Sequence, residues 1–132
     1  MRRLNAEKLV QAGCLVTVGT DNYVASSPQF TRDPKPIWQE PGIGTLMAIE
    51  GLVELGMTPA EAIVAGTKNG AIAARGLDEF GTIEPGKSAD LVLLDANPLE
   101  DISNIHRQSL VMARGEVVDI ASLPSSPVMF RT

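Results

Sequence analysis

Residues 15–21 read Leu-Val-Thr-Val-Gly-Thr-Asp, and this stretch decides the fold that we expect. The apolar, partly β-branched run from Cys14 to Val18 is typical of a strand buried on both faces, as in a parallel sheet. A predicted helix over residues 2–12 precedes it and ends at Gly13. Helix, glycine and buried strand form half of a repeating α/β unit. Asp21 follows the strand tip, where barrel enzymes place their reactive groups, although an aspartate after a strand is just as often a helix cap or turn former.

Length, charge and composition limit what the chain can be. Its 132 residues suffice for one modest domain, whereas a complete (β/α)₈ barrel takes about 250, and seldom fewer than about 200. The net charge of −5 argues against a nucleic-acid partner. No apolar run approaches the roughly 20 residues of a membrane span, and the N-terminus does not resemble a signal peptide. We therefore expect a cytoplasmic protein without membrane contact.

A long segment over residues 22–44 follows the predicted strand and contains four prolines. Loops of this length in compact domains are usually functional or disordered. Loops that follow barrel strands shape specificity, so Tyr23 and Trp38 are candidate substrate-binding residues. Trp38 has an equal alternative role, which is to anchor the loop to the body of the domain.

Two helices and a β-rich region are predicted to follow. The first helix covers Thr45–Leu55. The second starts at a capping box, Thr58-Pro59-Ala60-Glu61, and runs to about Arg75. Beyond Gly81 the sequence predicts a type II turn, a strand over residues 89–95 and a hairpin that turns at Arg114-Gly115. The tail over residues 121–132 is expected to be loose.

Three motifs together resemble the C-terminal end of the metal-dependent amidohydrolase superfamily. They occur in the family's order: Gly19-Thr20-Asp21; Thr67, Asn69 and Ala71; and Gly81 to Leu93. The resemblance covers roughly residues 12–120 and implies an α/β fold. Residues 1–76 would be the last βα unit and closing helices of a (β/α)₈ barrel. Residues 77–120 would be part of a small β-rich domain, a composite sandwich that also draws strands from the N-terminus of the family's proteins.

The resemblance also implies a chemistry. Asp21 would be a metal ligand and general base in an enzyme that hydrolyses C–N bonds of amides, cyclic amides or amidine-type small molecules. The family's metal is divalent, with zinc foremost, and a metal-activated hydroxide would attack the substrate carbon. The family's His-x-His pair and its other ligands have no counterpart here, and one aspartate cannot hold a catalytic zinc, which needs about three protein ligands. We therefore expect this chain alone to bind no metal and to be inactive.

The chain could instead be a non-catalytic remnant or an interaction domain. As part of a barrel, the isolated chain would expose apolar edges, so we expect partial disorder, self-association or pairing with the missing N-terminal part. Thr67 and Asn69 are predicted to cap their helix or brace it against the β domain, in preference to contacting substrate. His106, the single histidine, is predicted to be a surface or hinge residue. Cys14 is predicted to be a buried, inert thiol.

Overall fold

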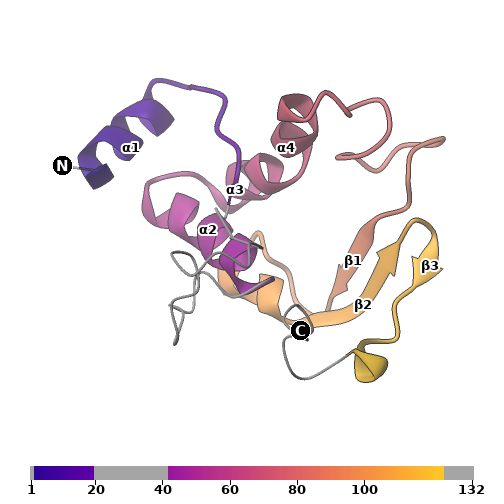
Figure 1. Ribbon diagram of the computed structural model, residues 1–132. Helices are drawn as coiled ribbons and strands as arrows, with labels where there is room; N and C mark the ends of the chain where they lie inside the picture. The colour runs from indigo at the N-terminus through magenta and orange to yellow at the C-terminus, as the bar shows by residue number, and fades with distance from the viewer. Residues whose placement is uncertain (1, 20–41, 124–132) are drawn as a thin grey trace, which may run out of the picture.

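The computed structural model describes residues 2–19 and 42–123, with helices first and strands after them (Figure 1). This mixture of helix and strand agrees with the predicted class. The elements are α1 (Arg2–Gln11), α2 (Ile43–Glu54), α3 (Pro59–Gly66), α4 (Lys68–Ala73), β1 (Leu91–Leu94), the 3-10 helix η2 (Ile102–His106), β2 (Gln108–Ala113), β3 (Glu116–Val117) and the 3-10 helix η3 (Ile120–Ser122).

Helix α2 forms where the apolar spacing predicts it, although it begins two residues before the predicted start at Thr45. Leu46, Ile49 and Val53 recur at intervals of three and four residues, so they fall on one stripe of the helix. Ile49 is buried, and the other two pack around the cluster that it belongs to. The helix ends before Gly56, which adopts a φ of +106° that glycine tolerates best.

Helix α3 begins with the predicted capping box. The Thr58 N–H donates to Glu61 Oε2 at 2.8 Å, and the Glu61 N–H donates to Thr58 Oγ1 at 3.3 Å. The Glu61 carboxylate also accepts from the Thr58 hydroxyl at 2.8 Å, and the bonds that it accepts from the Thr58 backbone and then from the Thr58 side chain lower the pKa of Glu61. The box thus satisfies two amide groups that a helix N-terminus otherwise leaves without partners.

The prediction of one helix from here to about Arg75 is wrong, because the helix breaks at Thr67. Thr67 has φ −124° and ψ −88°, outside the helical region, and separates α3 from α4. Its Oγ1 donates to the Ile63 carbonyl at 2.8 Å, a side-chain bond that competes with regular helix geometry. Gly66 precedes it and has low helix propensity.

The segment Cys14–Gly19 differs from the predicted buried strand. It forms no strand in the described part of the chain, Leu15 is 64% exposed, and the Cys14 thiol is exposed rather than buried. Val16 and Val18 are half-buried, so one side of the segment is covered and the other is open. A parallel strand is buried on both faces only when neighbouring strands and helices enclose it. The described residues supply helices on one side alone.

The three strands form an antiparallel sheet in the order β1-β2-β3. The predicted hairpin is confirmed: Met112 pairs with Val117, and the chain turns at Arg114 and Gly115. Both turn residues have positive φ, 51° and 84°, as a type I′ turn requires. The Asp90 carboxylate accepts a hydrogen bond from the Arg114 N–H at 2.7 Å, which fastens the turn to the chain before β1.

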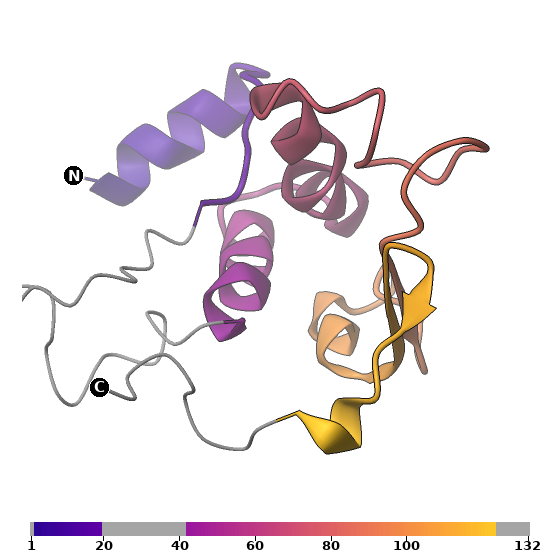
Figure 2. The same ribbon diagram turned by 45° about the vertical axis from the view of Figure 1, so that its right-hand side comes forward.

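One buried cluster joins the helices to the sheet. It consists of Ile49 from α2, Ala62 from α3 and Ile105 from η2, which is 6% exposed. Figure 2 shows η2 between the strands and α2. A second close approach occurs at Gly81, where a Cβ atom would collide with the Ala71 side chain of α4. The connection from α4 to the sheet therefore lies against the helix.

Candidate functional site

The predicted site residues Asp21, Tyr23 and Trp38 lie outside the described residues. What the structure describes is the framework on either side of them. The segment Cys14–Gly19 leads toward Asp21, and α2 begins shortly after Trp38.

The segment before Asp21 rests on α3 and α4. Asn69 Nδ2 donates to the Val16 carbonyl at 2.8 Å, and the Val18 N–H donates to the Ala65 carbonyl at 3.4 Å. Asn69 is thus a brace, as predicted. Its partner is this segment, however, and not the β domain that the sequence suggested. Gly81, rather than Asn69, is the residue that packs the following chain against α4.

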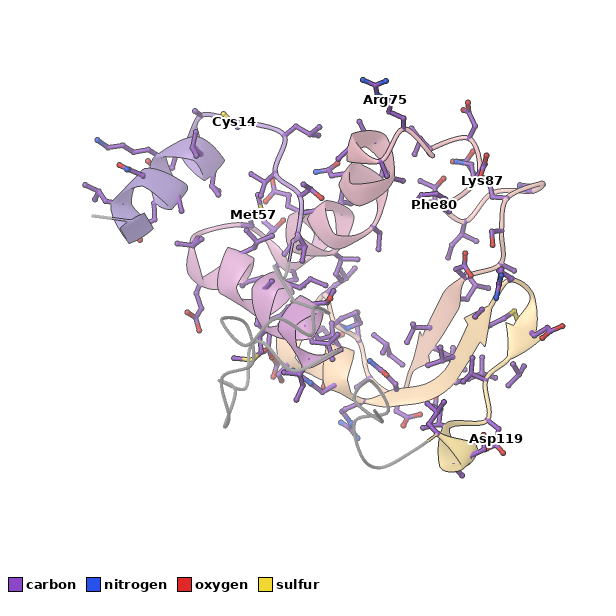
Figure 3. The ribbon with its side chains drawn as sticks, in the orientation of Figure 1. Cys14, Met57, Arg75, Phe80, Lys87 and Asp119 are labelled. Atoms are coloured by element: carbon purple, nitrogen blue, oxygen red, sulfur yellow. The ribbon has the colours of Figure 1, made fainter. Side chains whose placement is uncertain are left out.

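A shallow groove of about 410 Å³ lies beside this segment. Figure 3 marks Cys14 at the turn after α1 and Met57 at the connection between α2 and α3. Both residues line the groove together with Leu15, Ala60 and Val64. Apolar side chains form most of its wall, so the groove offers packing surface and little polar recognition.

His106 lies at the junction of η2 and α2. Its Nε2 atom is 3.1 Å from Glu50 Oε1, and 42% of its side chain is exposed. The prediction of a surface histidine agrees with this exposure. The pairing with Glu50 was not predicted, because the two residues are far apart in the sequence and no local motif connects them. The pair links the helices to the chain between β1 and β2.

The loop between Gly81 and Asp90 is held by its own polar side chains. Lys87 Nζ donates to Thr82 Oγ1 and lies 3.5 Å from Glu84 Oε1. Hydrogen bonding with Thr82 and the charge of Lys87 lower the pKa of Glu84. The Lys87 side chain is mostly covered, and its contacts are those of a turn residue.

Two aspartates outside the strands have similar structural roles. The backbone N–H of Arg114, and next the hydroxyl of Ser88 at 2.7 Å, lower the pKa of Asp90. Hydrogen bonds from Ser103 lower the pKa of Asp101, which caps η2. In both cases the charged form is favoured because donors surround it. Neither carboxylate is poised to take up a proton near neutral pH.

A metal centre cannot be assembled from the described residues. Residues 2–19 and 42–123 contain no group of three or more histidine, cysteine, aspartate or glutamate side chains that could hold an ion. In the same part of the chain, none of the helices combines the length and apolar character that a membrane crossing requires.

Comparison with known proteins identifies relatives over most of the chain. The model of the amidohydrolase family matches residues 2–118. An imidazolonepropionase from Geobacillus sp. (strain WCH70) is 41% identical over 91 residues, which are 69% of this chain and 19% of that protein. The solved structure of molinate hydrolase matches with a TM-score of 0.81 and 35% identity, over 97% of this chain and 29% of that one.

A second solved structure, phenylurea hydrolase B, matches almost as well. Its TM-score is 0.79 at 35% identity, over 96% of this chain and 28% of that one. The chain therefore spans less than a third of each of these relatives.

Proposed function

The chain belongs to the amidohydrolase family, and from this premise we propose that it forms the C-terminal portion of a metal-dependent hydrolase that cleaves C–N bonds. One observation carries the proposal: molinate hydrolase superposes on 97% of this chain, while the chain covers 29% of that enzyme. Residues 1–76 would complete a (β/α)₈ barrel, residues 77–120 would contribute to a β-rich composite domain, and residues 121–132 would be a tail.

Asp21 is the residue to which we assign the chemistry. It comes two residues after Gly19, directly beyond the extended segment that rests on α3 and α4. Along the sequence it has the same parity as Leu15 and Thr17, whose side chains are exposed. A carboxylate there would take up a proton and deliver it to the leaving nitrogen of the C–N bond.

The described residues do not supply a complete zinc site. A catalytic zinc takes about three protein ligands, and the described residues contain no group of three suitable side chains. His106 is engaged with Glu50. We therefore assign Asp21 as one ligand of a shared site, with the remaining ligands on a preceding portion of the protein. The metal, when bound there, would activate water for hydrolysis.

Substrate recognition falls to the segment after Asp21. Tyr23 and Trp38 belong to the loop over residues 22–44, and loops in this position shape barrel specificity. The names of the relatives indicate the range to test, since they include molinate, a phenylurea and an imidazolone acid. We propose a small molecule with a scissile C–N bond as the substrate.

A second candidate function is a non-catalytic pairing domain. It is favoured by the apolar side chains that the described residues leave open, among them Val92 and Leu93 of β1, which are 54% and 59% exposed. Such a surface would pair with a preceding portion of the protein or with a second copy of the chain.

Two matched substitutions distinguish these functions. The protein is isolated as it occurs in its source, with whatever polypeptide accompanies it, and its metal content and hydrolysis of molinate, a phenylurea and a cyclic amide are measured. Asp21→Asn should lower bound metal and reduce hydrolysis at least a hundredfold, whereas Asp78→Asn, at an exposed position, should change neither. Unchanged activity in Asp21→Asn would contradict the assigned role, and absence of hydrolysis in the unmodified protein would favour the pairing domain.

A further inference from the structure

Two hydrogen bonds hold the segment Cys14–Gly19 against α3 and α4. Among the described residues, no strand pairs with this segment. The bond from Asn69 Nδ2 to the Val16 carbonyl is 2.8 Å long and partly buried. The bond from the Val18 N–H to the Ala65 carbonyl is 3.4 Å long, near the limit of a hydrogen bond. The hydrogen bond from the Asn69 amide is therefore the stronger of the two.

The surface around Asn69 allows the segment to come close. Gly66 is the last residue of α3, and Gly70 lies within α4. A Cβ at Gly70 would lie 3.6 Å from Thr17 Oγ1, whereas one at Gly66 would first meet Ile49 of α2 at 2.8 Å and would lie 3.8 Å from Val18 Cγ2. Because Gly70 carries no side chain, the segment lies close to α4, within reach of the short Asn69 side chain.

The register of this contact decides which side chains are covered. Val16 and Val18 are half-buried, whereas Leu15 and Thr17 are exposed, with Thr17 Oγ1 beside Gly70 of α4. Because side chains alternate along extended backbone, a slip by one residue would exchange these two sets. Apolar burial alone favours one register over the other only weakly, since Leu15 would replace a valine on the covered side. A directed hydrogen bond to one particular carbonyl favours a single register strongly.

We propose that Asn69 is a positioning residue that fixes the register of Cys14–Gly19 on α3–α4. It thereby also fixes the point from which the chain proceeds to the Asp21 carboxylate, and this second part rests on the proposed function of Asp21. The Thr67-x-Asn69 motif then has a defined use. Thr67 interrupts the helix, and Asn69 lies in the first turn of the new one, α4.

The direct test is nuclear magnetic resonance of the full chain. A through-hydrogen-bond coupling between the Asn69 side-chain nitrogen and the Val16 carbonyl carbon is expected, together with a contact between the Val18 methyls and Gly66. In Asn69→Asp, which keeps the shape but loses the amide donor, the Val18–Gly66 contact should disappear. Hydrogen exchange at the Val18 amide should become at least tenfold faster.

The matched control is Asn104→Asp. Asn104 Nδ2 also donates to a main-chain carbonyl, that of Asn97, at 2.9 Å, and this bond does not involve the segment. This variant should leave the Val18 amide unchanged. The Asn69→Asp variant should recover protection below about pH 4, where its carboxylic acid regains an O–H donor. A role in packing alone would give no such recovery.

The kinetic arm uses the protein isolated as it occurs in its source. Asn69→Asp should lower kcat about tenfold or more with little change in KM, because a shift of the segment Cys14–Gly19 would misplace the Asp21 carboxylate. The proposal would be overturned if Asn69→Asp kept the Val18–Gly66 contact, or if Asn104→Asp lost that contact equally. A shifted register with unchanged kcat would also overturn it. If Asn69→Asp does not fold, absence of the coupling in the unmodified chain would do so. The register measurements need no hydrolysis, so their failure is distinct from a failure of Asp21→Asn.

Discussion

Ile105 of η2 and Ile49 of α2 lie in one buried cluster, exposed by 6% and 8%. The first comes from the chain between β1 and β2, and the second from the helix that follows the region of Asp21. This apolar contact, together with the His106–Glu50 pair beside it, joins the sheet to the helices.

Truncation of Ile105 should therefore affect the whole described structure. We expect Ile105→Ala to lower the free energy of unfolding by about 2–4 kcal/mol, because it removes buried methyl groups and leaves a cavity. Ile83→Ala, at a side chain that is 87% exposed, should change it by no more than about 0.5 kcal/mol. Urea unfolding of both variants measures the difference, and equal effects would show that the cluster does not join the two parts.

The capping box gives a local prediction. Thr58→Ala removes the hydroxyl that accepts from the Glu61 N–H and should destabilise the protein by about 1 kcal/mol. Thr45→Ala, at an exposed position within α2, should have no such cost. Circular dichroism during thermal unfolding compares the two, and a Thr58→Ala variant as stable as Thr45→Ala would contradict the role of the box.

The lowered pKa of Asp90 predicts that the free energy of unfolding depends on pH in the acid range. Donors from Arg114 and Ser88 lower its pKa in the folded state. A group whose folded pKa is depressed stabilises the protein above its unfolded pKa, about 3.9, and this contribution is lost as the pH falls through the folded pKa. Unfolding free energy should thus decline below about pH 4, and more gradually in Asp90→Asn. Asp78→Asn, which changes an exposed side chain, serves as the control, and identical profiles for all three proteins would be inconsistent with this reading.

Substitutions at two glycines with positive φ distinguish the energetic cost of backbone strain from that of steric collision. Gly86 has φ +91° in open space, whereas Gly81 has φ +96° and lies against Ala71 of α4. Gly86→Ala should cost about 1–2 kcal/mol from backbone conformation. Gly81→Ala adds overpacking of about 1–3 kcal/mol. Melting temperatures should therefore fall further for Gly81→Ala, and a reversed order would refute the close approach to α4.

The features that the sequence predicted correctly depend on neighbouring residues. The capping box at Thr58, the end of α2 before Gly56 and the hairpin at Arg114-Gly115 each follow from residues a few positions apart. Their geometry is decided by main-chain conformation and short-range hydrogen bonds.

The features that the sequence did not predict depend on distant partners. The exposure of Cys14 and Leu15 reflects the absence of neighbouring strands in the described chain, which the composition of the segment does not reveal. The Glu50–His106 pair likewise depends on a contact that local patterns do not encode. Asp21 stays a prediction, because it lies outside the described residues.

If this chain completes the site of a longer hydrolase, the coding sequence upstream of the Met1 codon will show it. We predict an open reading frame that continues upstream and contains a strand ending in His-x-His, whose ligands would complete the site to which Asp21 belongs. An in-frame stop codon followed by a start at Met1 would contradict the account and favour the non-catalytic pairing domain.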